Sequence, residues 1–197
     1  LEKLRKHNYR GLVNAGTGVG KTATGLFAAR EGGADVTLVI APDQTHESAW
    51  APTVARINGT EARTIGSRNK ATKQALTDFE LGFPGVYMVT PEFFTRADIS
   101  AWNGDLLIVD EAHKLARPGG KGQRKLGGYD SSDPEPLARR FDGVMHLSGT
   151  MLRNRFEYAW SHGRSIWPEL NKRGQLADES FYLWQSDRML YETITTG

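Results

Sequence analysis

Short apolar runs alternate with segments of helical periodicity along most of the chain. The runs that we interpret as strands cover residues 12–14, 36–41, 61–65, 86–89, 105–110 and 144–147. Between them, apolar residues recur every three or four positions. These segments predict a first helix that ends at Gly32-Gly33 and further helices over about 45–57, 69–79, 93–102, 136–141 and 156–168.

This alternation predicts βαβ units with right-handed crossovers. The run at 36–41 is almost continuously apolar, as in a parallel strand that is buried on both faces. We therefore expect an α/β fold of three layers, in which helices cover both faces of a mostly parallel central sheet. Ligands of such sheets bind beyond the carboxyl ends of the strands.

The loop after the first strand fits the pattern of a phosphate-binding loop. It reads Ala15-Gly16-Thr17-Gly18-Val19-Gly20-Lys21-Thr22, with Ala15 in place of the usual first glycine. Its glycines let backbone N–H groups turn inward around phosphate oxygens, and the following helix points its positive end at the same anion. We expect the phosphates of a nucleoside triphosphate to bind residues 16–22, with Lys21 at the β- and γ-phosphates and the Thr22 hydroxyl on Mg²⁺. A glycine-rich turn with a chance Gly-Lys-Thr is the plain alternative.

An acidic pair, Asp110-Glu111, ends the strand at 105–110. Asp110 is expected to hold the Mg²⁺ that Thr22 also touches, and Glu111, which points another way, to polarise the attacking water. Lys21, Asp110 and Glu111 are thus the predicted catalytic residues, and we expect them to grip magnesium and triphosphate from adjoining strand ends. A strand-ending acidic pair without a ligand is the alternative.

Two further features are candidates for coupling. His113 has no partner at metal-ligand spacing, so we expect it to form a hydrogen bond beneath the nucleotide or to be an inert surface histidine. Ser148-Gly149-Thr150 would by default be a tight turn. Because it directly follows the strand after the acidic pair, we interpret it as a coupling element.

Composition narrows the class of protein. The chain has 197 residues, no cysteine and a formal net charge of +2. This length suits one α/β domain, and the lack of cysteine suits an intracellular protein, cytoplasmic or, in a eukaryote, nuclear. The sequence has no apolar run of membrane-spanning length, so no membrane partner is expected. Residues 114–133 look mobile and basic, and Lys121, Arg124 and Lys125 there would either hold nucleic acid or form a solvated loop.

These motifs, in this order, resemble those of the superfamily-two helicases of the DEAH-box type. The phosphate loop resembles motif I, Ala41-Pro42 with Trp50 motif Ia, Thr90-Pro91-Glu92 motif Ib, Asp-Glu-Ala-His at 110–113 motif II and Ser-Gly-Thr at 148–150 motif III. The segment 147–154 with Glu157 and Trp160 is similar to that of Swi/Snf-type DNA translocases, although Met151 and Arg153 replace the usual Pro and Gln. Trp167-Pro168-Glu169-Leu170 is also similar to that family's following segment.

The resemblance implies that residues 1–170 form the first of two RecA-like lobes, and that 171–197 are a helical extension toward the second lobe. It also implies ATP hydrolysis coupled to movement on nucleic acid, with double-stranded DNA preferred and weak or no turnover by this lobe alone. Nucleic acid would contact Pro42, Thr90, Pro91 and Glu92.

Two other classes of function stay open. A stand-alone P-loop NTPase or kinase would act on a small molecule without nucleic acid. A nucleic-acid-binding module that has lost turnover is disfavoured by the presence of Lys21, Thr22, Asp110 and Glu111.

Overall fold

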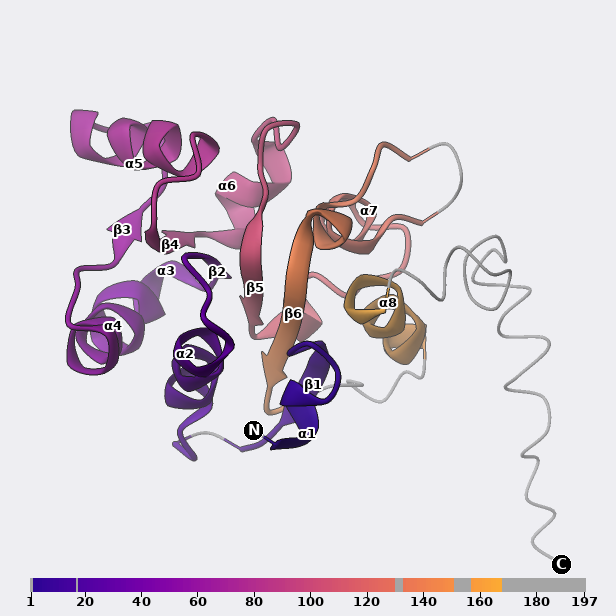
Figure 1. Cartoon of the computed structure of the whole chain (residues 1–197). Coiled ribbons are helices and arrows are strands. Elements are labelled where there is room, and N and C mark those ends of the chain that lie inside the picture. The colour runs from indigo at the N-terminus through magenta and orange to yellow at the C-terminus, as the bar shows by residue number, and fades with distance from the viewer. Residues whose placement is uncertain (1, 17, 130–132, 151–156, 168–197) are drawn as a thin grey trace, which may run out of the picture.

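The computed structural model describes residues 2–16, 18–129, 133–150 and 157–167. Within these ranges the centre of the molecule is a six-stranded parallel sheet in the order β1-β6-β5-β2-β4-β3 (Figure 1). Its strands are β1 (Gly11–Asn14), β2 (Val36–Ile40), β3 (Arg63–Thr64), β4 (Gly85–Val89), β5 (Gly104–Asp110) and β6 (Phe141–Ser148). The predicted α/β class with a parallel sheet is confirmed.

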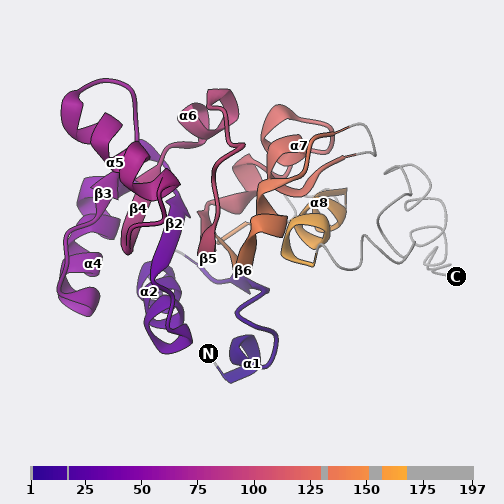
Figure 2. The same cartoon turned by 45° about the horizontal axis from the view of Figure 1, so that its top comes forward.

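Two apolar cores lie on opposite faces of this sheet, and Figure 2 shows the helices divided in the same way. One core joins the sheet to α2 (Lys21–Gly32) and α4 (Ala51–Asn58). The other joins it to α5 (Lys70–Glu80), α6 (Pro91–Arg96) and α7 (Lys121–Gly127). In β2, Leu38 and Ile40 belong to one core while Val39 belongs to the other. This burial on both sides explains the continuous apolar run.

The remaining elements are short, apart from a last helix. α1 (Glu2–Arg5) precedes β1, and α8 (Glu157–Ile166) packs near β6 and α7. A helical stretch between β2 and α4 consists of α3 (Asp43–Thr45) and the π-helical η1 (His46–Trp50). Two 3-10 turns, η2 (Ala112–Lys114) and η3 (Leu137–Arg140), follow β5 and precede β6.

The expected helix over 93–102 begins and ends earlier, at Pro91 and Arg96. The Thr90 hydroxyl accepts a hydrogen bond from the Phe93 N–H at 3.1 Å, and Pro91 occupies the first turn, where its missing N–H costs nothing. After Ala97, the Asp98 carboxylate accepts from the Ser100 N–H and forms a turn. Local capping therefore decided both ends of this helix.

The segment 114–133, expected to be a mobile basic loop, contains α7 and is tied into the fold. Arg124 donates to Asp133 at 2.7 Å, and the Lys125 ammonium donates to the carbonyls of Phe94 and Ala97. These contacts tie both side chains into the fold, so the alternative of a solvated loop is wrong for them, while binding of nucleic acid by these side chains stays a prediction. Lys121 stays exposed.

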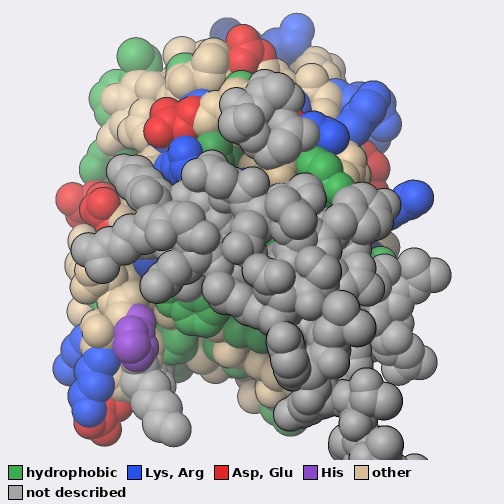
Figure 3. Space-filling model, turned by 90° about the vertical axis from the view of Figure 1, so that its right-hand side faces the viewer, with side chains coloured by type: hydrophobic (Ala, Val, Ile, Leu, Met, Phe, Trp, Pro, Cys, Tyr) green, Lys and Arg blue, Asp and Glu red, His purple; other side chains and the backbone are tan. Residues whose placement is uncertain are grey.

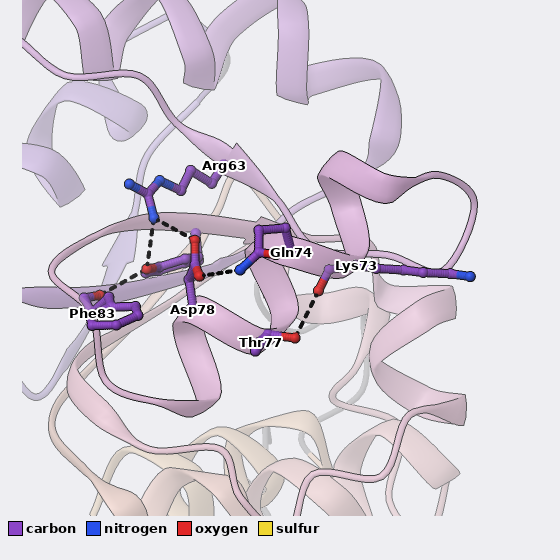
Figure 4. Close-up of polar contacts among 7 residues, drawn as sticks. Arg63, Lys73, Gln74, Thr77, Asp78 and Phe83 are labelled. Carbon is purple, nitrogen blue, oxygen red and sulfur yellow. Dashed lines mark hydrogen bonds and ion pairs between the residues drawn. The ribbon is translucent and has the colours of Figure 1, made fainter.

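A polar network fastens α5 to β3 and β4 (Figure 4). Arg63 donates to Asp78 at 3.1 Å and to the Tyr87 hydroxyl at 3.4 Å, while Gln74 donates to Asp78 at 2.7 Å. The Tyr87 hydroxyl in turn donates to the Phe83 carbonyl at 2.8 Å. The network holds the short strand β3 in place, and with it the loop that follows.

Candidate nucleotide-binding site

The carboxyl ends of β1, β6 and β5 lie in register at one edge of the sheet. Asn14 pairs with Ser148, and Leu147 pairs with Asp110. The Ala15 N–H continues the ladder to the Ser148 carbonyl at 3.1 Å. β6 therefore lies between the phosphate-loop strand and the acidic strand, so the expectation that these two strands adjoin is wrong. Ser148 is instead the residue between them.

The phosphate loop has the backbone that its glycines predict. Gly18 and Gly20 have φ values of 77° and 85°, in the left-handed region that disfavours side chains. Added Cβ atoms there would meet nothing within 4 Å, so conformation rather than crowding requires glycine. Ala15 is not among the non-glycine residues with positive φ, which explains why alanine is accepted there. Thr17 lies outside the described residues.

Lys21 begins α2, directly after the left-handed Gly20. Its ammonium donates to the carbonyls of Ala15 at 2.9 Å and Gly16 at 2.8 Å. The lysine thus folds back over the loop, at the position where the loop and the amino end of α2 present N–H groups. Thr22 is half-buried in the same first turn.

Asp110 is held at both of its oxygens. Its Oδ2 accepts from the Trp50 indole N–H at 3.0 Å, and its Oδ1 accepts from the Glu111 backbone N–H at 2.9 Å. Burial raises the pKa of this carboxyl group, while these two hydrogen bonds and the nearby Lys21 charge lower it. Because β6 pairs with both β1 and β5, the loop that carries Lys21 and the strand end that carries Asp110 lie at the same edge of the sheet.

Glu111 has a left-handed backbone, with φ 48° and ψ 46°. Such a conformation costs a non-glycine residue on the order of 1–3 kcal/mol, and it recurs at functional sites. It turns the chain sharply at the end of β5. Glu111 Oε2 lies 3.2 Å from His113 Nδ1.

His113 and Ser148 connect the ends of β5 and β6. His113 is only 8 % exposed, and its Nδ1 lies 2.8 Å from the Ser148 hydroxyl. That hydroxyl also accepts from the Thr150 N–H at 3.1 Å. The interpretation of His113 as an inert surface residue is therefore wrong, and the predicted coupling residues His113, Ser148 and Thr150 are in contact. Gly149 approaches the loop closely, since a Cβ there would lie 3.3 Å from the Ala15 carbonyl oxygen.

The residues predicted to contact nucleic acid gather at a second place on the same edge. Pro42, Thr90, Pro91 and Glu92 line a cleft of about 660 Å³ beyond the ends of β2, β3 and β4. The loop after β3 and two basic side chains complete its lining, and sequence reasoning did not single them out: Gly66, Ser67, Arg68, Asn69, Arg96 and Lys114. The sequence feature that could have indicated this part of the cleft is the run of small and polar residues at 66–69, directly after the predicted strand at 61–65.

Trp50 has a contact with the site that its sequence pattern did not predict. Helical periodicity predicted it as a core anchor, and its side chain is fully buried. The structure adds its hydrogen bond to Asp110, 60 positions along the chain.

Some predictions lie outside the described residues, namely segment 151–156, Pro168-Glu169-Leu170 and the extension 171–197. Figure 3 shows Lys and Arg side chains beside Asp and Glu side chains at the upper left and the lower left of the view. In the described part of the chain, no helix is long and apolar enough to cross a membrane.

Comparison with known proteins gives a family and a fold. The family described as "Type III restriction enzyme, res subunit" matches residues 1–131. A comparison with the sequences of curated proteins gives no significant match.

Among solved structures, the chain is similar to the Sulfolobus solfataricus SWI2/SNF2 ATPase core in complex with dsDNA. The TM-score is 0.67 at 18% identity, over 94% of this chain and 36% of that one. The Sulfolobus solfataricus SWI2/SNF2 ATPase core domain gives a TM-score of 0.64 at 17% identity, over 93% and 34% of the two chains. This chain spans about a third of the length of these structures. The similarity establishes a RecA-like fold.

Proposed function

The chain belongs to the family of type III restriction enzyme res subunits, and on this premise we propose that it is the ATP-binding lobe of a helicase or translocase that moves on double-stranded DNA. One observation carries the proposal. The loop with Lys21 follows β1, Ser148 ends β6 and Asp110 ends β5, which are neighbouring strands in the sheet, and Ser148 contacts His113. A phosphate cradle, an acidic pair and a link between them are the parts that nucleotide hydrolysis requires.

We propose that ATP binds with its phosphates in residues 16–22. The N–H groups of the loop and the amino end of α2 would bind phosphate oxygens, and Lys21 would exchange its two carbonyl partners for the β- and γ-phosphates. Base specificity has no support from the described residues and is carried by the resemblance alone.

Asp110 and Thr22 suit a magnesium ion. Mg²⁺ prefers oxygen ligands and is usually held by one or two protein groups together with phosphates and water. The described residues contain no group of three or more His, Cys, Asp or Glu that could hold a metal, which fits a site completed by the nucleotide. When bound, Mg²⁺ would neutralise the charge that develops on the phosphates.

Glu111 is the proposed base that orients the attacking water. Glu111 contacts His113, whereas Asp110 is hydrogen-bonded to Trp50, so the two carboxylates have different neighbours and one can serve the metal while the other orients the water. Glu111 contacts His113, and His113 contacts Ser148 at the end of β6. A change at the acidic pair would therefore be transmitted to β6 through these two contacts.

The cleft beyond β2, β3 and β4 is the proposed DNA-binding surface. Arg68 and Arg96 are exposed there, and the amino ends of α5 and α6 open onto it through the Asn69 and Thr90 caps. Such groups suit sequence-independent contacts with phosphate and sugar. The similar SWI2/SNF2 core was solved with dsDNA, which favours duplex DNA as the partner.

ATPase measurements with and without duplex DNA test the proposal. A second lobe supplies arginine residues in motors of this kind, so we expect ATP binding but almost no turnover by these 197 residues. The natural protein with both lobes should hydrolyse ATP faster when duplex DNA is added. Vigorous, DNA-independent turnover by this chain would instead favour a stand-alone NTPase or kinase.

Replacing both Arg68 and Arg96 by alanine should weaken DNA binding without changing ATP affinity. Each lost phosphate contact should reduce the slope of log affinity against log salt by about 0.9, and hence by about 1.8 for the pair. Fluorescence anisotropy with labelled duplexes at several salt concentrations measures this slope. Arg56→Ala is the matched control, because Arg56 is exposed on α4 and does not line the cleft. An unchanged slope in the double variant would exclude this cleft as the DNA-binding surface.

A further inference from the structure

Trp50 lies in the apolar core on the α2 and α4 face of the sheet and contacts Asp110 from there. Its indole ring is fully buried in the core between α2, α4 and the sheet, together with Leu26, Val54 and Ile108. Only its N–H leaves this apolar setting, by donating to Asp110 Oδ2 at 3.0 Å. A buried indole N–H needs an acceptor, and this one has a carboxylate.

The two hydrogen bonds on Asp110 fix the plane of its carboxylate. The Glu111 N–H comes from the chain itself and moves with the end of β5. The Trp50 N–H comes from a different element of the fold. This hydrogen bond therefore fixes the orientation of the Asp110 carboxylate relative to that element. Each carboxylate oxygen can accept more than one hydrogen bond, which leaves both able to face a ligand.

The backbone around Trp50 is unusual. Residues His46–Trp50 form a π-helical turn within the helical stretch that starts after Pro42. Such turns are rare and concentrate at functional sites. At its start, the buried His46 ring nitrogen Nε2 lies 2.9 Å from the Ala41 carbonyl oxygen. The turn is thus anchored to the end of β2 at one end and to Asp110 at the other.

We propose that Trp50 is a positioning residue, which holds the Asp110 carboxylate in the orientation that Mg²⁺ with ATP requires. The inference rests on the proposed function, since it needs Asp110 to serve the metal. It adds that a residue of the apolar core, with no access to solvent, sets magnesium affinity. Residues that orient metal-binding carboxylates commonly change metal affinity by about 10–100-fold when replaced.

A purely structural role for Trp50 is the competing explanation, and the protein contains a matched control for it. Trp102 is also fully buried and also donates its indole N–H to a carboxylate, Glu80 Oε1, at 3.2 Å. It packs in the core on the other face of the sheet, among Phe79 and Phe94. Trp102→Phe removes the same atoms and the same kind of hydrogen bond away from the site.

The test compares Trp50→Phe with Trp102→Phe in a magnesium titration. Binding of a fluorescent ADP analogue is measured at increasing Mg²⁺ and, separately, in EDTA. We expect Trp50→Phe to raise the Mg²⁺ concentration for half-maximal binding about tenfold, with magnesium-free binding unchanged and no such shift in Trp102→Phe. Equal magnesium dependence of Trp50→Phe and wild type would overturn the inference.

Two further measurements keep the outcomes separate. If the wild type shows no magnesium-dependent nucleotide binding, the proposed function itself fails. If thermal unfolding shows that Trp50→Phe does not fold, benzothienylalanine at position 50 replaces it, since this isostere keeps the shape and lacks the N–H. The same shift is expected, and its absence in the folded isostere would overturn the inference.

Discussion

Glu111→Gln is expected to abolish ATP turnover while leaving ATP binding intact. Glutamine has the same shape but cannot take a proton from water, and general-base catalysis is typically worth about 10²–10⁴-fold in rate. Glu111 follows Asp110 through a left-handed backbone and contacts His113 at 3.2 Å, whereas the Asp110 carboxylate is hydrogen-bonded to Trp50, so the two carboxylates have separate neighbours. The measurement is DNA-stimulated phosphate release by a chain that also carries the proposed second lobe, beside nucleotide affinity.

Glu61→Gln is the matched control for this experiment. Glu61 is exposed after α4, away from the phosphate loop and the acidic pair, so its loss should change neither binding nor turnover. Normal turnover by Glu111→Gln would show that another group orients the water. A loss of nucleotide binding in Glu111→Gln would show that Glu111 contributes to nucleotide binding rather than to the orientation of the attacking water.

Lys21→Ala should lower ATP affinity about 100-fold, because hydrogen bonds to charged groups contribute about 1.5–3 kcal/mol and this ammonium can bind two phosphates. In the structure the Lys21 ammonium donates to the carbonyls of Ala15 and Gly16, so the variant also loses these contacts within the loop. Titration with a fluorescent ATP analogue at fixed Mg²⁺ measures the change.

Lys73→Ala controls for the loss of a positive charge. Lys73 is exposed on α5, on the opposite face of the sheet from α2. Its removal should leave ATP affinity unchanged. An affinity of Lys21→Ala within threefold of wild type would contradict the proposed phosphate cradle.

The strands and the phosphate loop could be predicted because local chemistry specifies them. A parallel strand buried on both faces needs an uninterrupted apolar run, as at Val36–Ile40. The left-handed positions at Gly18 and Gly20 need glycine wherever the loop occurs. The helix over 93–102 and the loop over 114–133 were predicted less well, because a Thr90 cap and the buried contacts of Lys125 outweighed composition.

By itself, the sequence determined the approximate positions of the strands, the class of the fold and the glycine positions of the loop after β1. Only the tertiary structure decided which strand ends meet. Alternation along the chain does not specify order across a sheet, so the position of β6 between β1 and β5, and with it the contact of Ser148 with His113, could not be predicted. Helical spacing likewise marks Trp50 as apolar and buried, but the partner of its one polar atom is 60 residues away. A contact between residues so far apart in the chain depends on how the elements pack, and no local sequence pattern predicts it.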